Sequence, residues 1–173
     1  VFLGAKRVQT VSIDLVADEI DCGKPDRISP ADRIELAGIE SYDYPVYPAE
    51  RAVADKACGI VERHSGRPSS RVKDLVDIVV YARNVAFGFD TLSAALKTEF
   101  SVRKLASSRT FSTPPEWGDA QARQYRRLAE QTGTPNHFHD IRNAETLAKK
   151  LIEPCLSDRT DLSVWSTKTL TWE

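Results

Sequence analysis

Three charged residues, Lys56, Asp74 and Asp77, stand where apolar residues are expected within residues 47–83. Lys56 shares a predicted helical face with an alanine four residues before it and an isoleucine four residues after it. A buried lysine is costly unless something needs its charge. Asp74 and Asp77 belong to the next predicted helix, and Asp77 falls inside the apolar run 75–82. Together, the three side chains predict a polar site between two consecutive helices.

Each of these residues also has an ordinary explanation. Lys56 could bury its stem and leave its ammonium in water. Asp74 could be only a first-turn charge, and Asp77 could pair with Lys73 or Tyr81 at the i,i+4 spacing of one helix. We favour Asp74 as the working acid, because a first turn can present it at a cleft. Asp77 is expected to lie deeper in the apolar run.

Two helices joined by a polar loop must position this site. Pro48 suits the first turn of the first helix, where its missing N–H costs nothing. Residues 65–70 have the composition of a loop, and Ser70 is expected to cap the second helix. The second helix is apolar almost all round and is therefore predicted to be central.

Three further helices are predicted over residues 91–103, 115–131 and 144–153. Asn143 is expected to cap the last of them and Pro154 to end it. Trp165 and Trp172 are expected to pack back onto the helices.

One strand is predicted ahead of the helices, over residues 8–16, where apolar and polar side chains alternate. Asp14 lies on the face opposite the main apolar row. A carboxylate on a rigid sheet suits Mg²⁺, which prefers oxygen ligands at fixed geometry. An edge strand with Asp14 in water is the simpler alternative. Residues 18–32 are expected to form a loop, 34–39 a short strand or irregular connection, and 42–48 an extended segment.

Length and composition are those of one globular domain with a real core: 173 residues, 41% hydrophobic and 28% charged. No apolar run has the length of a membrane span, and no secretory signal is recognisable. The cysteines, Cys22, Cys58 and Cys155, are widely spaced and odd in number, so they indicate neither a disulfide framework nor a metal motif. A reducing, cytoplasmic setting is expected.

Charge is unevenly distributed along the chain. Residues 1–50 carry a net charge of −5, and the remainder carries +4. Within that remainder, residues 97–127 hold seven Lys and Arg against three Asp and Glu. Such a basic region can bind a polyanion, and ordinary solvated helix faces explain it equally well.

Several familiar motifs are absent from the sequence. It has no glycine-rich phosphate loop, GxGxxG, GxSxG or zinc pattern, which leaves P-loop ATPases, Rossmann dehydrogenases and α/β-hydrolases unsupported. It also has no methionine, even at position 1, and it opens directly on strand-like residues. We therefore expect that Val1 is not the native start.

The middle of the chain resembles the nucleotidyltransferase toxins of the AbiEii/AbiGii family, and most closely its MenT-type members. The matching residues are Tyr47-Pro48, Ala54-Asp55-Lys56 and Arg71-Val72-Lys73-Asp74-Leu75-Val76-Asp77. Weaker similarities are the Asp14 strand and the spacing of Phe111, Pro115, Trp117 and Tyr125.

The resemblance implies an α+β, nucleotidyltransferase-like fold, with a remnant of a small sheet followed by a mostly α-helical C-terminal part. The implied divisions are 1–46 for the sheet, 47–88 for the central helical pair and 89–173 for the C-terminal helical region. Family members use three carboxylates to hold Mg²⁺ and are usually paired with a cognate antitoxin. MenT-type members transfer nucleotides from an NTP to the 3′ end of tRNA.

The resemblance also implies roles for individual residues. Asp14 would be a catalytic metal carboxylate, Lys56 would face the triphosphate or the catalytic centre, and Asp74 would be the acid beside it. Contacts to nucleotide or RNA would come from Arg71, Lys73 and Asp77. Asp74 and Asp77 would also orient Lys56 or a ligand hydroxyl.

One family feature is missing from this sequence: a Gly-Ser followed by Asp-x-Asp on a strand, which we expect upstream of Val1. Without those two carboxylates a two-metal clamp cannot form, so we expect this piece to be inactive alone. Two alternatives remain from the residues: a non-catalytic helical module that binds RNA or protein through residues 97–127, and a metal-dependent nuclease that uses the same carboxylates.

Overall fold

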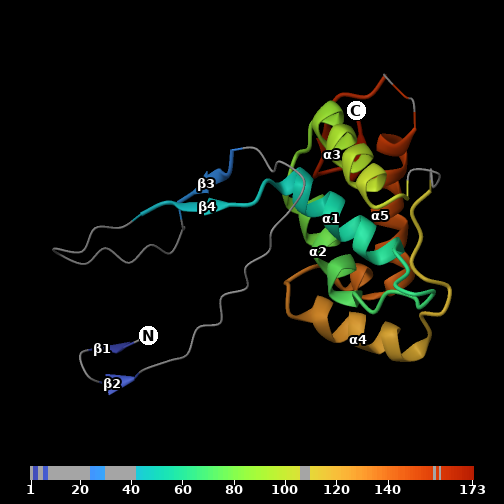
Figure 1. Cartoon of the computed structure of the whole chain (residues 1–173), viewed down its shortest axis with the longest axis horizontal. Helices are drawn as coiled ribbons and strands as arrows, with labels where there is room; N and C mark the ends of the chain where they lie inside the picture. The colour runs from blue at the N-terminus through green and yellow to red at the C-terminus, as the bar shows by residue number, and fades with distance from the viewer. Residues whose placement is uncertain are drawn as a thin grey trace.

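A computed structural model describes residues 24–29, 42–105, 110–157, 159 and 161–173, together with the backbone of 2–3 and 6–7. The predicted strand 8–16, which carries Asp14, and the segment 34–39 lie outside these residues. The described residues form five α-helices and three two-stranded antiparallel pairs (Figure 1). The predicted α+β class with a mostly helical later part is therefore confirmed.

The described strands and helices are grouped along the chain: short strands come first, helices follow, and a strand pair comes last. The strands are β1 Phe2–Leu3, β2 Lys6–Arg7, β3 Asp26–Ile28, β4 Tyr44–Val46, β5 Trp165–Ser166 and β6 Thr171–Trp172. The helices are α1 Ala49–Val61, α2 Val72–Asn84, α3 Phe89–Val102, α4 Asp119–Glu130, the 3-10 turn η1 Asn136–His139, and α5 Ile141–Leu156. The strands pair in chain order, β1 with β2, β3 with β4 and β5 with β6.

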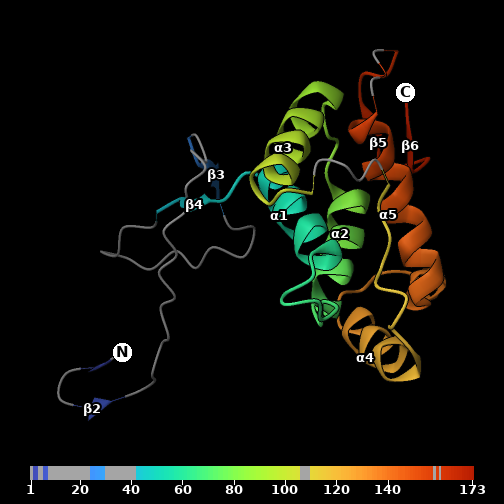
Figure 2. The same ribbon diagram turned by 45° about the vertical axis from the view of Figure 1, so that its right-hand side comes forward.

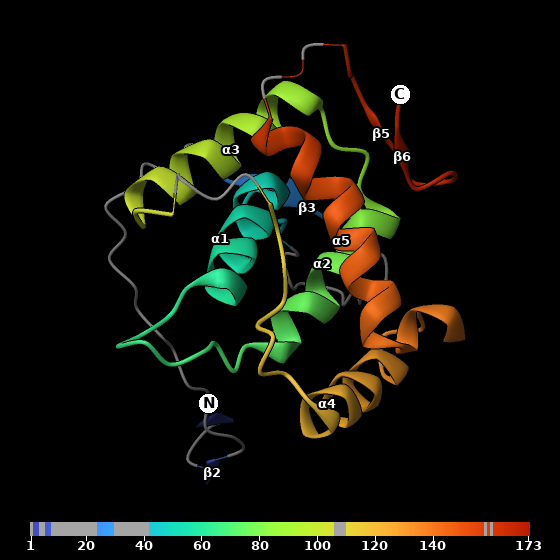
Figure 3. The ribbon, with the colours of Figure 1, turned by 90° about the vertical axis from the view of Figure 1, so that its right-hand side faces the viewer.

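The core lies among the helices, with α2 at its centre. Helix α1 packs on α2 and α3, α5 packs on α2 and α3, and α4 packs against α2 (Figure 3). As the apolar run predicts, α2 buries most of its length, including Leu75, Ile78, Val79 and Ala82. None of the helices in the described ranges is both long and apolar enough to cross a membrane.

The β3–β4 hairpin corrects the prediction of a loop over residues 18–32. Arg27 lies opposite Pro45 in an antiparallel pair, and the hairpin stands out from the helices (Figures 1 and 2). Its strands have three residues each and are largely exposed, so they lack the apolar alternation by which a sequence reveals a strand.

The starts of α2 and α4 differ from the prediction. Helix α2 is preceded by Arg71 as its N-cap, not Ser70, and the Ser69 hydroxyl accepts the Arg71 N–H at 3.2 Å. Helix α4 begins at Asp119, four residues late, because Trp117 holds the preceding turn in place. The indole N–H of Trp117 donates to the Ser69 carbonyl at 2.7 Å, which ties this turn to the loop before α2.

The last helix is also longer than predicted at both ends. Asp140, not Asn143, caps α5 and accepts the Arg142 N–H at 2.8 Å. Pro154 lies inside the helix, which continues to Leu156. A proline this close to the C-terminus removes only one backbone hydrogen bond, and the extra turn buries apolar side chains.

The C-terminal hairpin packs onto the helices as predicted. Trp165 is fully buried, and its indole N–H donates to the Ala82 carbonyl at 2.6 Å. Trp172 donates to the Leu151 carbonyl at 3.1 Å and meets the Phe89 ring edge to face. The tail therefore closes the bundle over the end of α2.

Candidate active site

Lys56 lies between two aspartates of the neighbouring helix. Its Nζ on α1 is 2.8 Å from Asp77 Oδ2 and 3.5 Å from Asp74 Oδ1, both on α2. About a fifth of the Lys56 and Asp77 side chains is exposed, against 9% for Asp74. The structure thus joins the three residues that the sequence singles out.

Asp77 has a second cation beside it on its own helix. Lys73 Nζ lies 3.0 Å from Asp77 Oδ1 and 2.8 Å from Oδ2, at the predicted i,i+4 spacing. Both explanations for Asp77 therefore apply, because its carboxylate contacts Lys73 on its own helix and also Lys56 on α1.

The prediction that Asp77 lies deeper than Asp74 is wrong. Asp74 is the more buried of the pair, because Arg71 folds back over the first turn of α2. Arg71 Nε lies 2.7 Å from Asp74 Oδ2, but that buried oxygen accepts no aligned hydrogen bond from the described residues. This oxygen is therefore paired with Arg71 and closed to solvent, while Asp77 is the more accessible carboxylate.

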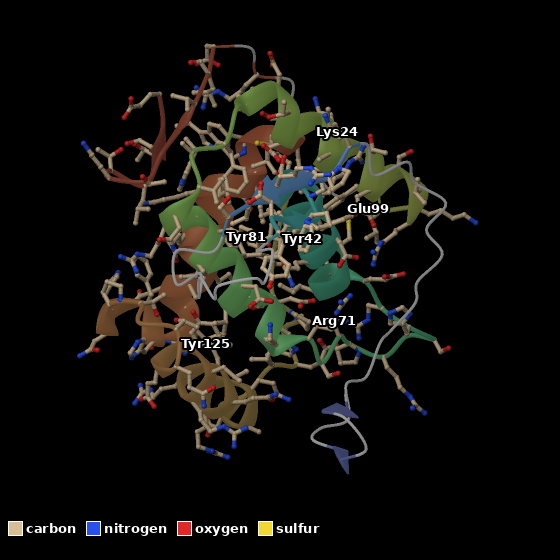
Figure 4. All side chains as sticks on the ribbon, turned by 90° about the vertical axis from the view of Figure 1, so that its left-hand side faces the viewer. Lys24, Tyr42, Arg71, Tyr81, Glu99 and Tyr125 are labelled. Atoms are coloured by element: carbon tan, nitrogen blue, oxygen red, sulfur yellow. The ribbon has the colours of Figure 1, made fainter. Side chains whose placement is uncertain are left out.

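Arg71 connects this cluster to α1. It lies between α1 and the start of α2 (Figure 4), and its side chain is 46% exposed. Its Nη2 is 3.9 Å from Asp55 Oδ2 on α1. The guanidinium therefore contacts both helices and still presents donors to the surface.

A second charged cluster, one arginine among three carboxylates, was missed by the sequence analysis and extends the network to α3. Arg103 contacts Asp55, lies 3.1 Å from Glu62 and lies 2.7 Å from Glu99. Only the Glu99–Arg103 pair, at i,i+4, carries a signal in the sequence. Asp55 receives both Arg71 and Arg103, so it links the two clusters.

Both Lys56 and Asp77 are held in their charged forms. Burial alone would lower the pKa of Lys56, but the hydrogen bond and charge of Asp77 and the charge of Asp74 outweigh it and raise that pKa. Burial would raise the pKa of Asp77, but hydrogen bonds from Lys56 and Lys73 outweigh it and lower that pKa. By formal charge, the three cations Lys56, Arg71 and Lys73 are matched by the three carboxylates of Asp55, Asp74 and Asp77, so the cluster carries no excess positive charge.

Neither of the described cysteines is suited to act as a nucleophile. Cys58 and Cys155 are both buried and free of disulfides. Burial raises the pKa of Cys58, and it raises the pKa of Cys155 to about 12. Because the thiolate is the reactive form, neither of these two thiols supplies a nucleophile at neutral pH.

The described part of the site does not fit a divalent metal. Across the described ranges, no group of three or more His, Cys, Asp or Glu side chains could hold one. Asp74 and Asp77 each contact cationic side chains instead. Asp14, the predicted metal carboxylate, lies outside the described residues.

The model of one protein family, nucleotidyl transferase AbiEii toxin of type IV toxin–antitoxin systems, matches residues 1–152. The chain belongs to this family. Comparisons with curated proteins and with solved structures gave no match. The predicted resemblance to the AbiEii family is thus confirmed, and the match covers the whole Lys56 cluster. Membership makes the chain a nucleotidyltransferase toxin and implies a nucleotide substrate and an antitoxin partner.

Proposed function

We propose that this protein transfers a nucleotide from an NTP to RNA, with the 3′ end of tRNA as acceptor. The observation that carries the proposal is the Lys56 ammonium, held between Asp74 and Asp77 at the joint of two helices and still partly exposed. Arg71 and Lys73 lie beside it and reach the surface. Several cations around one partly exposed point suit a triphosphate.

The proposed reaction is a displacement at the α-phosphorus. An RNA hydroxyl oxygen attacks that phosphorus and passes its proton to solvent water, the bond from the α-phosphorus to the α,β-bridging oxygen breaks, and pyrophosphate leaves with that oxygen. Enzymes catalyse such transfers mainly by positioning groups and neutralising charge. Lys56 would neutralise phosphate charge, and Asp77 and the Oδ1 atom of Asp74 would orient Lys56.

Mg²⁺ accompanies the NTP in this proposal, and its proposed ligand is Asp14. The support for both is the family resemblance, since the described carboxylates do not form a metal site. The roles given above to Lys56, Asp74 and Asp77 use only contacts among described residues. The cytoplasm, where NTP and tRNA occur together, is the proposed location.

An arginine face on α4 supports RNA as the acceptor. Arg123, Arg126 and Arg127 share one exposed side of the helix, and none makes an ion pair with another described residue. Asp119 and Glu130 at the helix ends leave one positive charge in excess. Arg126 lines two hollows, of about 270 and 370 Å³. Helix α4 packs against α2 (Figure 3) through the side that carries the buried Tyr125 and Ala129, and the three arginines lie on its exposed side.

The same arginine face favours the second candidate function, an RNA-binding module without catalysis. That candidate needs the α4 arginines but not Lys56. A nuclease would instead shorten RNA without any NTP. The three functions therefore differ in what they do to RNA when NTP is supplied or withheld.

The test uses protein expressed from its complete reading frame, tRNA, Mg²⁺ and each NTP labelled at either the α- or the γ-phosphate. Label from the α-phosphate in RNA, with none from the γ-phosphate, is the expected result. Label from the γ-phosphate would mean phosphoryl transfer and would refute the proposal. Shortened RNA without NTP would identify a nuclease, and unlabelled RNA retained by the protein would identify a binding module.

A further inference from the structure

Gly59 is buried in the last turn of α1, where the backbone conformation does not require a glycine. Its φ is not in the left-handed region, unlike Gly66 and Gly133, so it does not end the helix as a glycine cap. Glycine is also a weaker helix former than alanine. The reason for glycine here must lie in its missing side chain.

The space beside Gly59 is filled by Arg71. A Cβ built on Gly59 would lie 3.0 Å from Arg71 Cζ, 3.1 Å from Cδ and nearer still to Nη1. Real Cβ atoms essentially never have a neighbour as near as this Nη1, and the contacts with Cζ and Cδ are also unusually tight. By contrast, a Cβ on Gly118 would meet no atom within 4 Å. The Arg71 guanidinium therefore lies directly against the backbone of α1.

Contacts on either side fix the guanidinium in that place. Asp55, four residues before Gly59 on the same face of α1, lies 3.9 Å from Arg71 Nη2. Asp74 on α2 lies 2.7 Å from Nε. Arg103 holds Asp55 from α3, together with Glu62. Arg71 thus occupies a position between α1 and the first turn of α2 that is bounded by Gly59, Asp55 and Asp74, and we call this position the seat of Arg71.

We infer that Gly59 is a positioning residue that seats Arg71 against α1, so that its exposed edge faces the phosphates of the nucleotide. The role assigned to that edge rests on the proposed function, whereas the seat itself rests on the contacts alone. A methyl group at position 59 would push the flexible Arg71 side chain out of the seat while leaving the chain able to fold.

The seat is tested first without any activity, by melting Gly59→Ala, Arg71→Ala and the double variant. With Arg71 removed, Gly59→Ala should raise Tm by about 1–4 °C, because alanine favours the helix. With Arg71 present, the same change should give a smaller rise or a fall, because the methyl group displaces the arginine. Equal changes in Tm with and without Arg71 would contradict the inference that Arg71 packs against Gly59.

The functional part is tested by α-labelled NTP transfer with protein from the complete reading frame. Gly59→Ala, Arg71→Ala and the double variant should all raise the KM for NTP by the same factor, with little change in kcat. Gly118→Ala, which adds the same methyl group in open space, is the control and should match the wild type. Losses that multiply in the double variant would overturn the inference. A wild-type protein without transfer would instead refute the proposed function and leave the melting cycle to decide the seat.

Discussion

Replacing Lys56 with alanine separates the stability of the cluster from its chemistry. The substitution removes the 2.8 Å hydrogen bond to Asp77 and the 3.5 Å contact with Asp74. A hydrogen bond to a charged group contributes about 1.5–3 kcal/mol. Because Asp77 keeps Lys73 and Asp74 keeps Arg71, we expect a loss of only about 1–2 kcal/mol, which lowers Tm by about 2–8 °C.

The effect on nucleotide transfer should be much larger. Removing one group that stabilises transition-state charge typically costs about 10²–10³ in rate. A domain that loses about 1–2 kcal/mol from a typical stability remains more than about 99% folded at 25 °C, so unfolding cannot explain such a loss. We therefore expect at least a hundredfold drop in transfer by a folded Lys56→Ala protein.

The assay combines a circular dichroism melt with initial rates of α-labelled NTP transfer, using protein from the complete reading frame. Lys150→Ala, which removes an exposed lysine from α5, is the matched control and should change neither measurement. Near wild-type transfer by Lys56→Ala would refute the assignment of Lys56. An unfolded variant would show that the lysine mainly serves the fold.

Three further predictions follow from other contacts. The pKa of Asp77 is lowered in the folded protein, so its contribution to stability is present above its ordinary pKa near 4 and is lost as the pH falls through the folded value. Asp77→Asn should therefore make the urea midpoint depend less on pH in the acid range. Trp165→Phe leaves the buried Ala82 carbonyl without its donor and should cost about 1–3 kcal/mol in urea unfolding, more than the same change at the partly exposed Trp172. Alanine at all three positions of the α4 arginine face should make the negative slope of log K for RNA against log salt less steep by about 2–3 in filter binding. An unchanged slope would place RNA elsewhere.

Much of the site could be predicted because it depends on spacing along single helices. Lys56 on an apolar face, and Asp77 four residues after Lys73, are visible in the sequence and meet in the structure. The depth of Asp74 could not be predicted, because it depends on Arg71 folding back across the helix start. Asp55 and Arg103 are 48 positions apart, so their contact leaves no local pattern.

Helix ends were harder to predict than helices, because several polar residues compete for each end. Ser70 and Asn143 are suitable caps by type, but Arg71 and Asp140 occupy those places. Pro154 is a helix breaker by type, but here it interrupts a turn that the buried core holds in place. The role of Asp14 and the three sequence divisions stay predictions.

The most direct test of the central claim is the intact mass of tRNA after incubation with mixed NTPs and protein from the complete reading frame. The proposal predicts a gain of one or more nucleoside monophosphate residues with the wild type and no gain with Lys56→Ala. An unchanged or reduced RNA mass with the wild type, or the same gain with both proteins, would contradict it.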